Sequence, residues 1–106
     1  MTVYVDAAHV AASVENGPRT HTSTWCHLMA DGNAELVAFA VRIGLRRNWI
    51  QREGSPFEHF DVTAGKRWQA VRLGAVEVDS HEAVALIVAK REGRVFDLAA
   101  FRSERG

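Results

Sequence analysis

The sequence is poor in the residues that mark secreted, membrane-spanning and strongly basic proteins. It has one cysteine, Cys26, which can form neither an internal disulfide nor a zinc cluster built from thiolates. Lysine plus arginine and aspartate plus glutamate number 13 each, so the formal net charge is zero and any anion site must be local. The longest apolar run, residues 83–89, is far shorter than the roughly 20 residues that span a bilayer.

The N-terminal segment MTVYVDAAHV also lacks the basic start, apolar stretch and cleavage site of a signal peptide. These absences predict a cytoplasmic protein with no membrane segment. What is present is an ordinary globular composition, 47% hydrophobic and 25% charged over 106 residues. A chain of this length forms one hydrophobic core, so we predict a single domain over residues 1–106.

Two segments differ from the rest of this domain. Residues 7–24 are rich in small and polar residues and contain Asn16, Gly17 and Pro18 in a row, which predicts a long loop or flap. Residues 94–106 form a C-terminal tail. Its apolar side chains indicate that the tail docks on the domain.

Hydrophobic periodicity predicts strands that alternate with helices. Short extended segments are expected at residues 3–5, 25–28, 49–51, 57–62 and 76–78. Helices are expected from the Asp31–Asn33 region to Gly44, from Thr63 to Gly74 and from Asp79 to Gly93, and their core residues include Leu36, Phe39, Ile43 and Trp68. We therefore predict the α/β class, a small sandwich with a mainly parallel sheet of three to four short strands and three helices.

Helix capping residues support these boundaries. Thr63 is expected to cap the second helix, and Asp79 with Glu82 has the spacing of a capping box at the third. Asp31 is the expected cap of the first helix, and Asn33 is the alternative cap.

Polar side chains fall at or near the carboxyl ends of the expected strands, which is where ligands of parallel sheets bind. Asp6, Asp61 and Asp79 lie at such ends. Because successive residues of a strand point to opposite faces, His59 and Asp61 share one face, and His27 shares one with Trp25.

Two imidazoles and several carboxylates suit a divalent metal and also general acid–base chemistry. We predict that His27, His59 and Asp61 are catalytic and lie in one cleft. Asp6, Asp61 and His59 are the predicted ligands of Mg²⁺, Mn²⁺ or Zn²⁺.

Several of these residues have a structural alternative. His27 is either a hydrogen-bonded histidine of the core or a residue of the site. The structural alternative for Asp79 is that it caps the last helix. Cys26, between Trp25 and His27, has the character of a small buried hydrophobe. The three remaining histidines are expected on the surface or in loops: His9, His21 and His81.

Lys66 and Arg67 stand in a first helical turn, where cations oppose the helix dipole at a cost of about 0.3 to 1 kcal/mol. A bound anion would reverse this cost, and Gly65 would let it approach the backbone. We therefore predict a site for a phosphate, a nucleotide or another small anion at Thr63, Lys66 and Arg67. The alternative is that both cations are solvated.

The segments VYVD, WCHLMAD, ELVAFAVRIGL, HFDVTAGKR and LGAVEV together resemble a small bacterial and phage family, the domain of unknown function numbered 4031. The likeness covers residues 1–86. It implies a polar signature that consists of Asp6, Trp25, His27, Asp31, His59, Asp61, Lys66 and Arg67, and so adds Trp25 to the ligand-binding residues. Cys26 replaces a usual serine and Val37 a frequent histidine. The family has no established activity, so the resemblance supports a location for the site and not its chemistry.

A weaker resemblance is to PIN-like nucleases, which hold metal with acids at strand ends. It implies that Asp6, Asp61 and Asp79 are the counterparts of these acids. The histidines and the short chain fit that family poorly.

The expected function is hydrolysis of nucleotide or nucleic-acid phosphoesters by a small intracellular domain. The alternative is a module that binds a small anionic ligand or a partner protein without catalysis, in a phage or host regulatory role. A homodimer is compatible with either function.

Overall fold

The computed structural model describes residues 2–8, 10–16 and 19–105, and the side chains of residues 2–8 and 25–105. The strands in these residues are β1 (Val3–Val5), β2 (Val10–Asn16), β3 (Arg19–Ala30), β4 (Phe60–Val62) and β5 (Val76–Glu77). The helices are α1 (Asn33–Arg42), the 3-10 helix η1 (Arg47–Trp49), α2 (Ala64–Arg72), α3 (Ser80–Arg91) and α4 (Leu98–Glu104).

The strands form one mixed sheet around β3, which confirms the α/β class but corrects the expectation of a mainly parallel sheet. β1, β2 and β4 all pair with β3 in antiparallel fashion, and only β1 and β5 are parallel. The connections explain this mixture. A short link joins β2 to β3 and favours their antiparallel pairing, whereas the parallel strands β1 and β5 are far apart in the chain and are joined by a long crossover.

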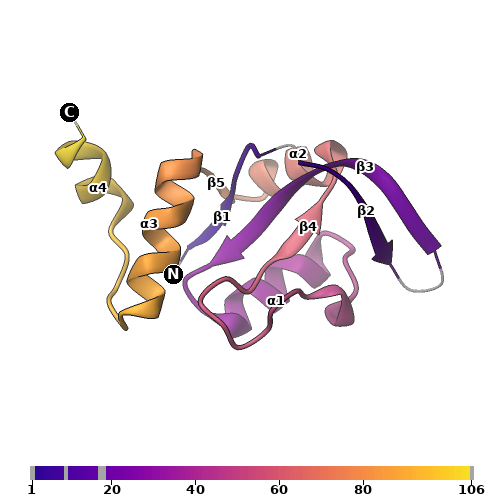
Figure 1. Cartoon of the computed structure of the whole chain (residues 1–106), viewed down its shortest axis with the longest axis horizontal. Coiled ribbons are helices and arrows are strands. Elements are labelled where there is room, and N and C mark those ends of the chain that lie inside the picture. The colour runs from indigo at the N-terminus through magenta and orange to yellow at the C-terminus, as the bar shows by residue number, and fades with distance from the viewer. Residues whose placement is uncertain (1, 9, 17–18, 106) are drawn as a thin grey trace.

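Residues 7–24 were expected to form a loop or flap, and this expectation is wrong for most of the segment. β2 pairs with the first half of β3, from Val10 opposite Trp25 to Asn16 opposite Arg19. The resulting hairpin extends beyond the rest of the molecule (Figure 1). Its small and polar residues hid the strands, because a hairpin ladder is made by backbone groups whatever the side chains. Gly17 and Pro18 lie outside the described residues.

Two clusters of buried side chains lie on opposite faces of the sheet. Cys26, Leu28 and Ala30 of β3 pack with residues of α1 and α2, among them Leu36 and Ala70. Residues at alternate positions, such as Met29 of β3, pack with Leu86 of α3. Since alternate residues of a strand point to opposite faces, α1 and α2 cover one face and α3 covers part of the other.

The first helix ends as the sequence predicted, but the core prediction for the second is partly wrong. Gly44, with φ of 89°, follows α1 in the left-handed region that favours glycine. Leu36 and Ile43 are buried and Phe39 is partly buried. Trp68 is 62% exposed instead of buried. α2 buries Ala70 against the sheet, while the Trp68 ring lies outside with the Arg72 guanidinium 4.8 Å from its centroid.

The predicted caps of α2 and α3 are confirmed, and that of α1 is corrected. Thr63 Oγ1 accepts a hydrogen bond from Lys66 N at 3.3 Å, and Asp79 forms a full capping box with Glu82. Gly32 is the N-cap of α1 and makes no side-chain cap.

Asp31 ties the N-terminal residues to the end of β3. Its carboxylate accepts hydrogen bonds of 2.9 Å from Thr2 N and from the Tyr4 hydroxyl. The Asp31 carboxylate oxygens therefore accept hydrogen bonds from Thr2 and from Tyr4 of β1, and not from the amides of α1.

Residues 49–51 were expected to form a strand, which is wrong. Trp49 ends η1, and Gln51 forms an isolated bridge with His59 instead of a ladder. The strand expected at 57–62 is shortened to β4, because Phe57 lies in a turn and His59 forms only the isolated bridge with Gln51.

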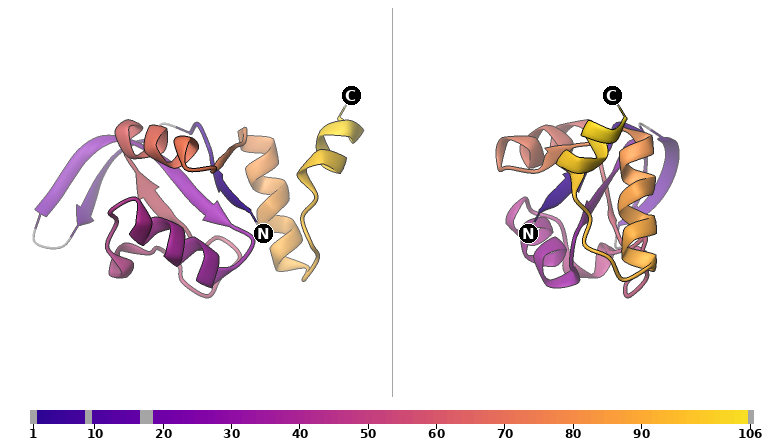
Figure 2. Two further views of the ribbon diagram at one scale, coloured as in Figure 1. Left: turned by 180° about the vertical axis from the view of Figure 1, so that it is seen from behind. Right: turned by 90° about the vertical axis from the view of Figure 1, so that its left-hand side faces the viewer.

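The C-terminal tail docks as predicted and adds a fourth helix that periodicity did not reveal. Phe96 makes an edge-to-face contact with Tyr4, with ring centroids 5.9 Å apart. Arg102 Nε donates to Glu82 Oε2 at 2.6 Å, and Arg105 Nη1 donates to Asp79 Oδ2 at 2.9 Å. α3 and α4 lie at the end of the molecule opposite to the hairpin (Figure 2).

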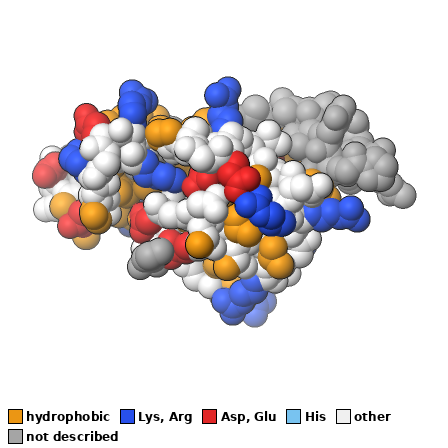
Figure 3. All heavy atoms as spheres, turned by 90° about the horizontal axis from the view of Figure 1, so that it is seen from below, with side chains coloured by type: hydrophobic (Ala, Val, Ile, Leu, Met, Phe, Trp, Pro, Cys, Tyr) orange, Lys and Arg blue, Asp and Glu red, His pale blue; other side chains and the backbone are white. Residues whose placement is uncertain are grey.

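The surface shows no single charge sign over the face drawn in Figure 3. Lysine and arginine side chains of the described residues are dispersed there among acidic and hydrophobic ones. In the described part of the chain, no helix has the length and apolar character that crossing a membrane requires.

Candidate functional site

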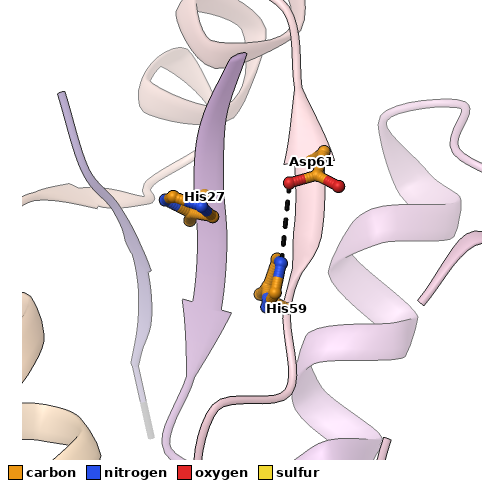
Figure 4. Close-up of side chains that lie close together, drawn as sticks. All are labelled: His27, His59 and Asp61. Carbon is orange, nitrogen blue, oxygen red and sulfur yellow. Dashed lines mark ion pairs between the residues drawn. The ribbon is translucent and has the colours of Figure 1, made fainter. Parts of the chain in front are cut away.

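Three potential metal ligands converge on the sheet face that α3 covers only in part. His27 lies on β3 and is the register partner of Asp61 on β4, and His59 stands two residues before Asp61 (Figure 4). One ligand atom from each of the three lies within 4.8 Å of the others. The structure thus brings together the residues that strand alternation predicted, with Asp6 beside them.

His59 is held in one orientation and one tautomer. Its Nδ1 lies 2.7 Å from the carbonyl oxygen of Phe57. Because a carbonyl oxygen only accepts, Nδ1 carries the proton and Nε2 of the neutral ring has a free lone pair. This Nε2 lies 3.5 Å from Asp61 Oδ1.

His27 is held by Asp6 in the same manner. Its Nδ1 lies 2.7 Å from Asp6 Oδ2, and its backbone N donates to Asp6 Oδ1 at 2.7 Å. The Asp6 side chain hydrogen bond raises the pKa of His27 above its usual range. Burial alone raises the pKa of Asp6, but the hydrogen bonds from His27 outweigh it, so the net effect is a lowered pKa.

Phe57 shields the two imidazoles. Its ring centroid lies 4.4 Å from that of His59 and 5.7 Å from that of His27, and the imidazole centroids are 5.0 Å apart. The exposed fractions of the side chains are 7% for His59, 17% for Asp61 and 22% for His27. The cluster is therefore shielded from bulk water yet still reached by it at His27.

Asp6 lies beside the three converging residues and, among them, forms hydrogen bonds with His27. Both Asp6 oxygens accept hydrogen bonds from His27, so this carboxylate stands behind the ring. Within the described residues, the cluster that could hold a metal consists of His27, His59 and Asp61. The role of Asp6 as a direct ligand stays a prediction from the sequence.

The cations predicted to bind an anion have intramolecular partners. Lys66 Nζ donates to Ile43 O at 2.6 Å, at the end of α1. Arg67 Nε donates to Asp6 O at 2.8 Å and its Nη1 lies 3.0 Å from Glu77 Oε1. Arg67 is therefore connected to the metal-ligand cluster by hydrogen bonds, from Arg67 to the Asp6 backbone and from His27 to the Asp6 side chain. Lys66 points to α1 instead.

Two further residues of the predicted site are Trp25, which is close to His27 in the sequence, and Asp79, which lines a pocket with Asp6. Trp25 is buried, two residues before His27 on β3. Asp79, the third acid of the PIN-like comparison, caps α3 and pairs with Arg105. It shares with Asp6 the lining of a pocket of about 550 Å³ at the carboxyl ends of the parallel strands β1 and β5.

Sequence reasoning missed Phe57. The residue lies at alternate spacing before His59 and Asp61, so strand periodicity offered a signal for a shared face. It was overlooked because a phenylalanine beside a glycine- and proline-containing break suggests only a strand end.

These features define a small α/β domain with a site of two histidines and one carboxylate on a sheet face. The chain belongs to the family described as protein of unknown function (DUF4031), whose model matches residues 3–90. The match includes the whole cluster and ends before α4. Neither a curated protein nor a solved structure matches the chain.

Proposed function

We propose that this domain hydrolyses phosphoester bonds of a nucleotide or nucleic acid with the help of a divalent metal. The observation that carries the proposal is the convergence of His27, His59 and Asp61, with Nδ1 of both rings engaged elsewhere. A metal held there would supply a Lewis acid and an activated water, which is the chemistry that phosphoester hydrolysis needs.

The neighbouring residues support this function in separate ways. Asp6 orients His27 and, by accepting a hydrogen bond from Nδ1, leaves Nε2 as the nitrogen that can bind a metal. Arg67, bonded to the backbone of Asp6, is the nearby cation that would attract a phosphate. Of the residues that the sequence predicted to bind the ligand, this proposal relies on Arg67, because Lys66 donates to Ile43 O, Thr63 caps α2 and Trp25 is buried.

Turnover is the direct test. The native protein is incubated with nucleotides and with bis(p-nitrophenyl) phosphate in the presence of Mg²⁺, Mn²⁺ or Zn²⁺, and product is measured. His59→Asn keeps a side-chain nitrogen at the position of Nδ1 and removes Nε2, so it should abolish turnover. His81→Asn is the matched control, because His81 is exposed on α3 and outside the cluster. Equal turnover in both variants would contradict the proposal.

Anion binding is tested without catalysis. Titration calorimetry with phosphate, sulfate and nucleotides compares the native protein with Arg67→Gln, which keeps a hydrogen-bond donor and removes the charge. We expect a clear loss of affinity. Unchanged affinity would remove Arg67 from the proposed site and leave the start of α2 as an ordinary capped helix.

A non-catalytic binding module is the second candidate. The small exposed fractions of His59 and Asp61 favour it, because they limit the access of a large substrate. If no substrate is turned over with any of the three metals, yet a nucleotide raises the melting temperature, binding without catalysis is the better account.

A further inference from the structure

We infer that the cluster of His27, His59 and Asp61 is a zinc site with three protein ligands and one open position. The inference rests on the proposed metal-dependent function and names its ion. Its test measures zinc binding and needs no substrate, so the zinc site and the proposed hydrolysis can be contradicted independently.

The donor atoms favour zinc over the other two ions of the proposed function, Mg²⁺ and Mn²⁺. Two imidazole nitrogens and one carboxylate oxygen form a set that zinc binds readily. Mg²⁺ prefers oxygen ligands in near-ideal octahedral geometry and keeps several waters, so a site with two nitrogens suits it poorly. Mn²⁺ binds a given set of nitrogen and oxygen ligands more weakly than zinc.

The distances are close to those of a tetrahedral site. Ligands about 2.0 to 2.1 Å from a tetrahedral zinc ion lie about 3.4 Å from one another. His59 Nε2 and Asp61 Oδ1 are already 3.5 Å apart. All three ligand atoms lie within 4.8 Å of one another, so closure needs a further approach of at most about 1.4 Å. His27 has the most exposed side chain of the three, so packing opposes a small rotation of its ring least.

The outer contacts of both histidines are an independent observation that points to a metal. A metal-binding histidine commonly donates its other ring N–H to a carboxylate or to a backbone carbonyl. His27 has the Asp6 carboxylate at Nδ1, and His59 has the Phe57 carbonyl at Nδ1. The same nitrogen of each ring, Nε2, is left for the ion.

The surroundings favour a low coordination number. Phe57 packs against both rings and leaves less room for the several waters that a six-coordinate ion would keep. Cys26 belongs to the core cluster on the opposite sheet face, so it supplies no thiolate. Among the described residues, three ligands therefore converge, and a water completes the four-coordinate arrangement of catalytic zinc.

The first experiment measures zinc binding to the full chain. Metal is removed with a chelator, and Zn²⁺ is titrated in competition with a chromophoric chelator. We expect one ion per chain. His27→Asn, His59→Asn and Asp61→Asn should each weaken binding by at least about 100-fold, because each removes one of three ligands. His81→Asn should bind as the native protein does. No saturable zinc binding, or equal binding in the ligand variants, would overturn the inference.

The second experiment needs no variant, so it holds even where a substitution prevents folding. Co²⁺ replaces zinc, and four-coordinate Co²⁺ should give strong visible absorption that a tenfold excess of Mg²⁺ leaves unchanged. The weak absorption of six-coordinate Co²⁺, or displacement by Mg²⁺, would overturn the inference. Zinc bound without turnover would leave the zinc site standing and contradict the hydrolase alone.

Discussion

His27 and Asp61 face each other directly across the antiparallel pair of β3 and β4. Directly opposed residues of such a pair have their Cβ atoms about 4.5 to 5.5 Å apart on the same face. His59 joins them because it stands two residues before Asp61. The cluster is thus a consequence of strand register, and a slip of one residue would put His27 on the face opposite to His59 and Asp61.

Asp6→Asn should weaken zinc binding by about 10- to 100-fold, because the carboxylate orients the His27 ring and raises its basicity. Affinity is measured with the competing chelator. Asp97→Asn serves as control, since asparagine also caps helices and Asp97 caps α4. A loss larger than that of His27→Asn would make Asp6 a direct ligand, as the sequence predicted. Unchanged affinity would contradict its positioning role.

Lys66→Ala should lower the free energy of unfolding by about 1 to 2 kcal/mol, because a charge-assisted hydrogen bond to the end of α1 is lost. Urea denaturation gives the value. Arg91→Ala, on the exposed face of the last turn of α3, should change it by less than about 0.5 kcal/mol. An unchanged or increased stability of Lys66→Ala would mean that the cation is present only for a ligand.

Trp68→Ser should change the free energy of unfolding by no more than about 0.5 kcal/mol, because the side chain is mostly exposed. Leu36→Ala, which truncates a fully buried side chain of α1, should cost about 2 to 5 kcal/mol. Both are measured by urea denaturation at one pH. A large loss for Trp68→Ser would show that the ring is covered in solution.

The contact between α4 and α3 should weaken in acid. Arg102 lowers the pKa of Glu82, whose side chain is 6% exposed, and the backbone N–H of Glu82 lowers that of Asp79. A carboxylate with a lowered folded pKa stabilises the protein above its ordinary pKa, 4.5 for Glu82, and this contribution is lost as the pH falls through the lowered value.

The stability difference between the native protein and Arg102→Ala should therefore be constant near pH 7 and shrink below pH 4.5. Urea denaturation between pH 7 and pH 3 measures it. Arg91→Ala again serves as control and should show no such change with pH. A difference that stays constant into acid would mean that Arg102 acts through packing alone.

Local interactions made part of the fold predictable. α1, α2 and α3 follow from periodicity, from the cap of Thr63, from the capping box of Asp79 with Glu82 and from Gly44 after α1. Each of these signals acts within one or two helical turns, so residues that are close in the sequence are enough to predict it. The shared face of His59 and Asp61 is local in the same sense, because alternation along a strand fixes it.

The contacts between distant segments decided the rest. Asp31 is a residue type that commonly caps helices, but its carboxylate accepts a hydrogen bond from the Tyr4 hydroxyl. Trp68 has the spacing of a buried helix residue, but its side chain is exposed on the outer side of α2. The pairing of β2 with β3 is made by backbone groups, which no side-chain pattern reports. The sequence by itself determined α1, α2, α3 and the ligand types of the site. Only the antiparallel register of β3 with β4 decided that His27 reaches His59 and Asp61, because that register depends on the packing of the whole sheet.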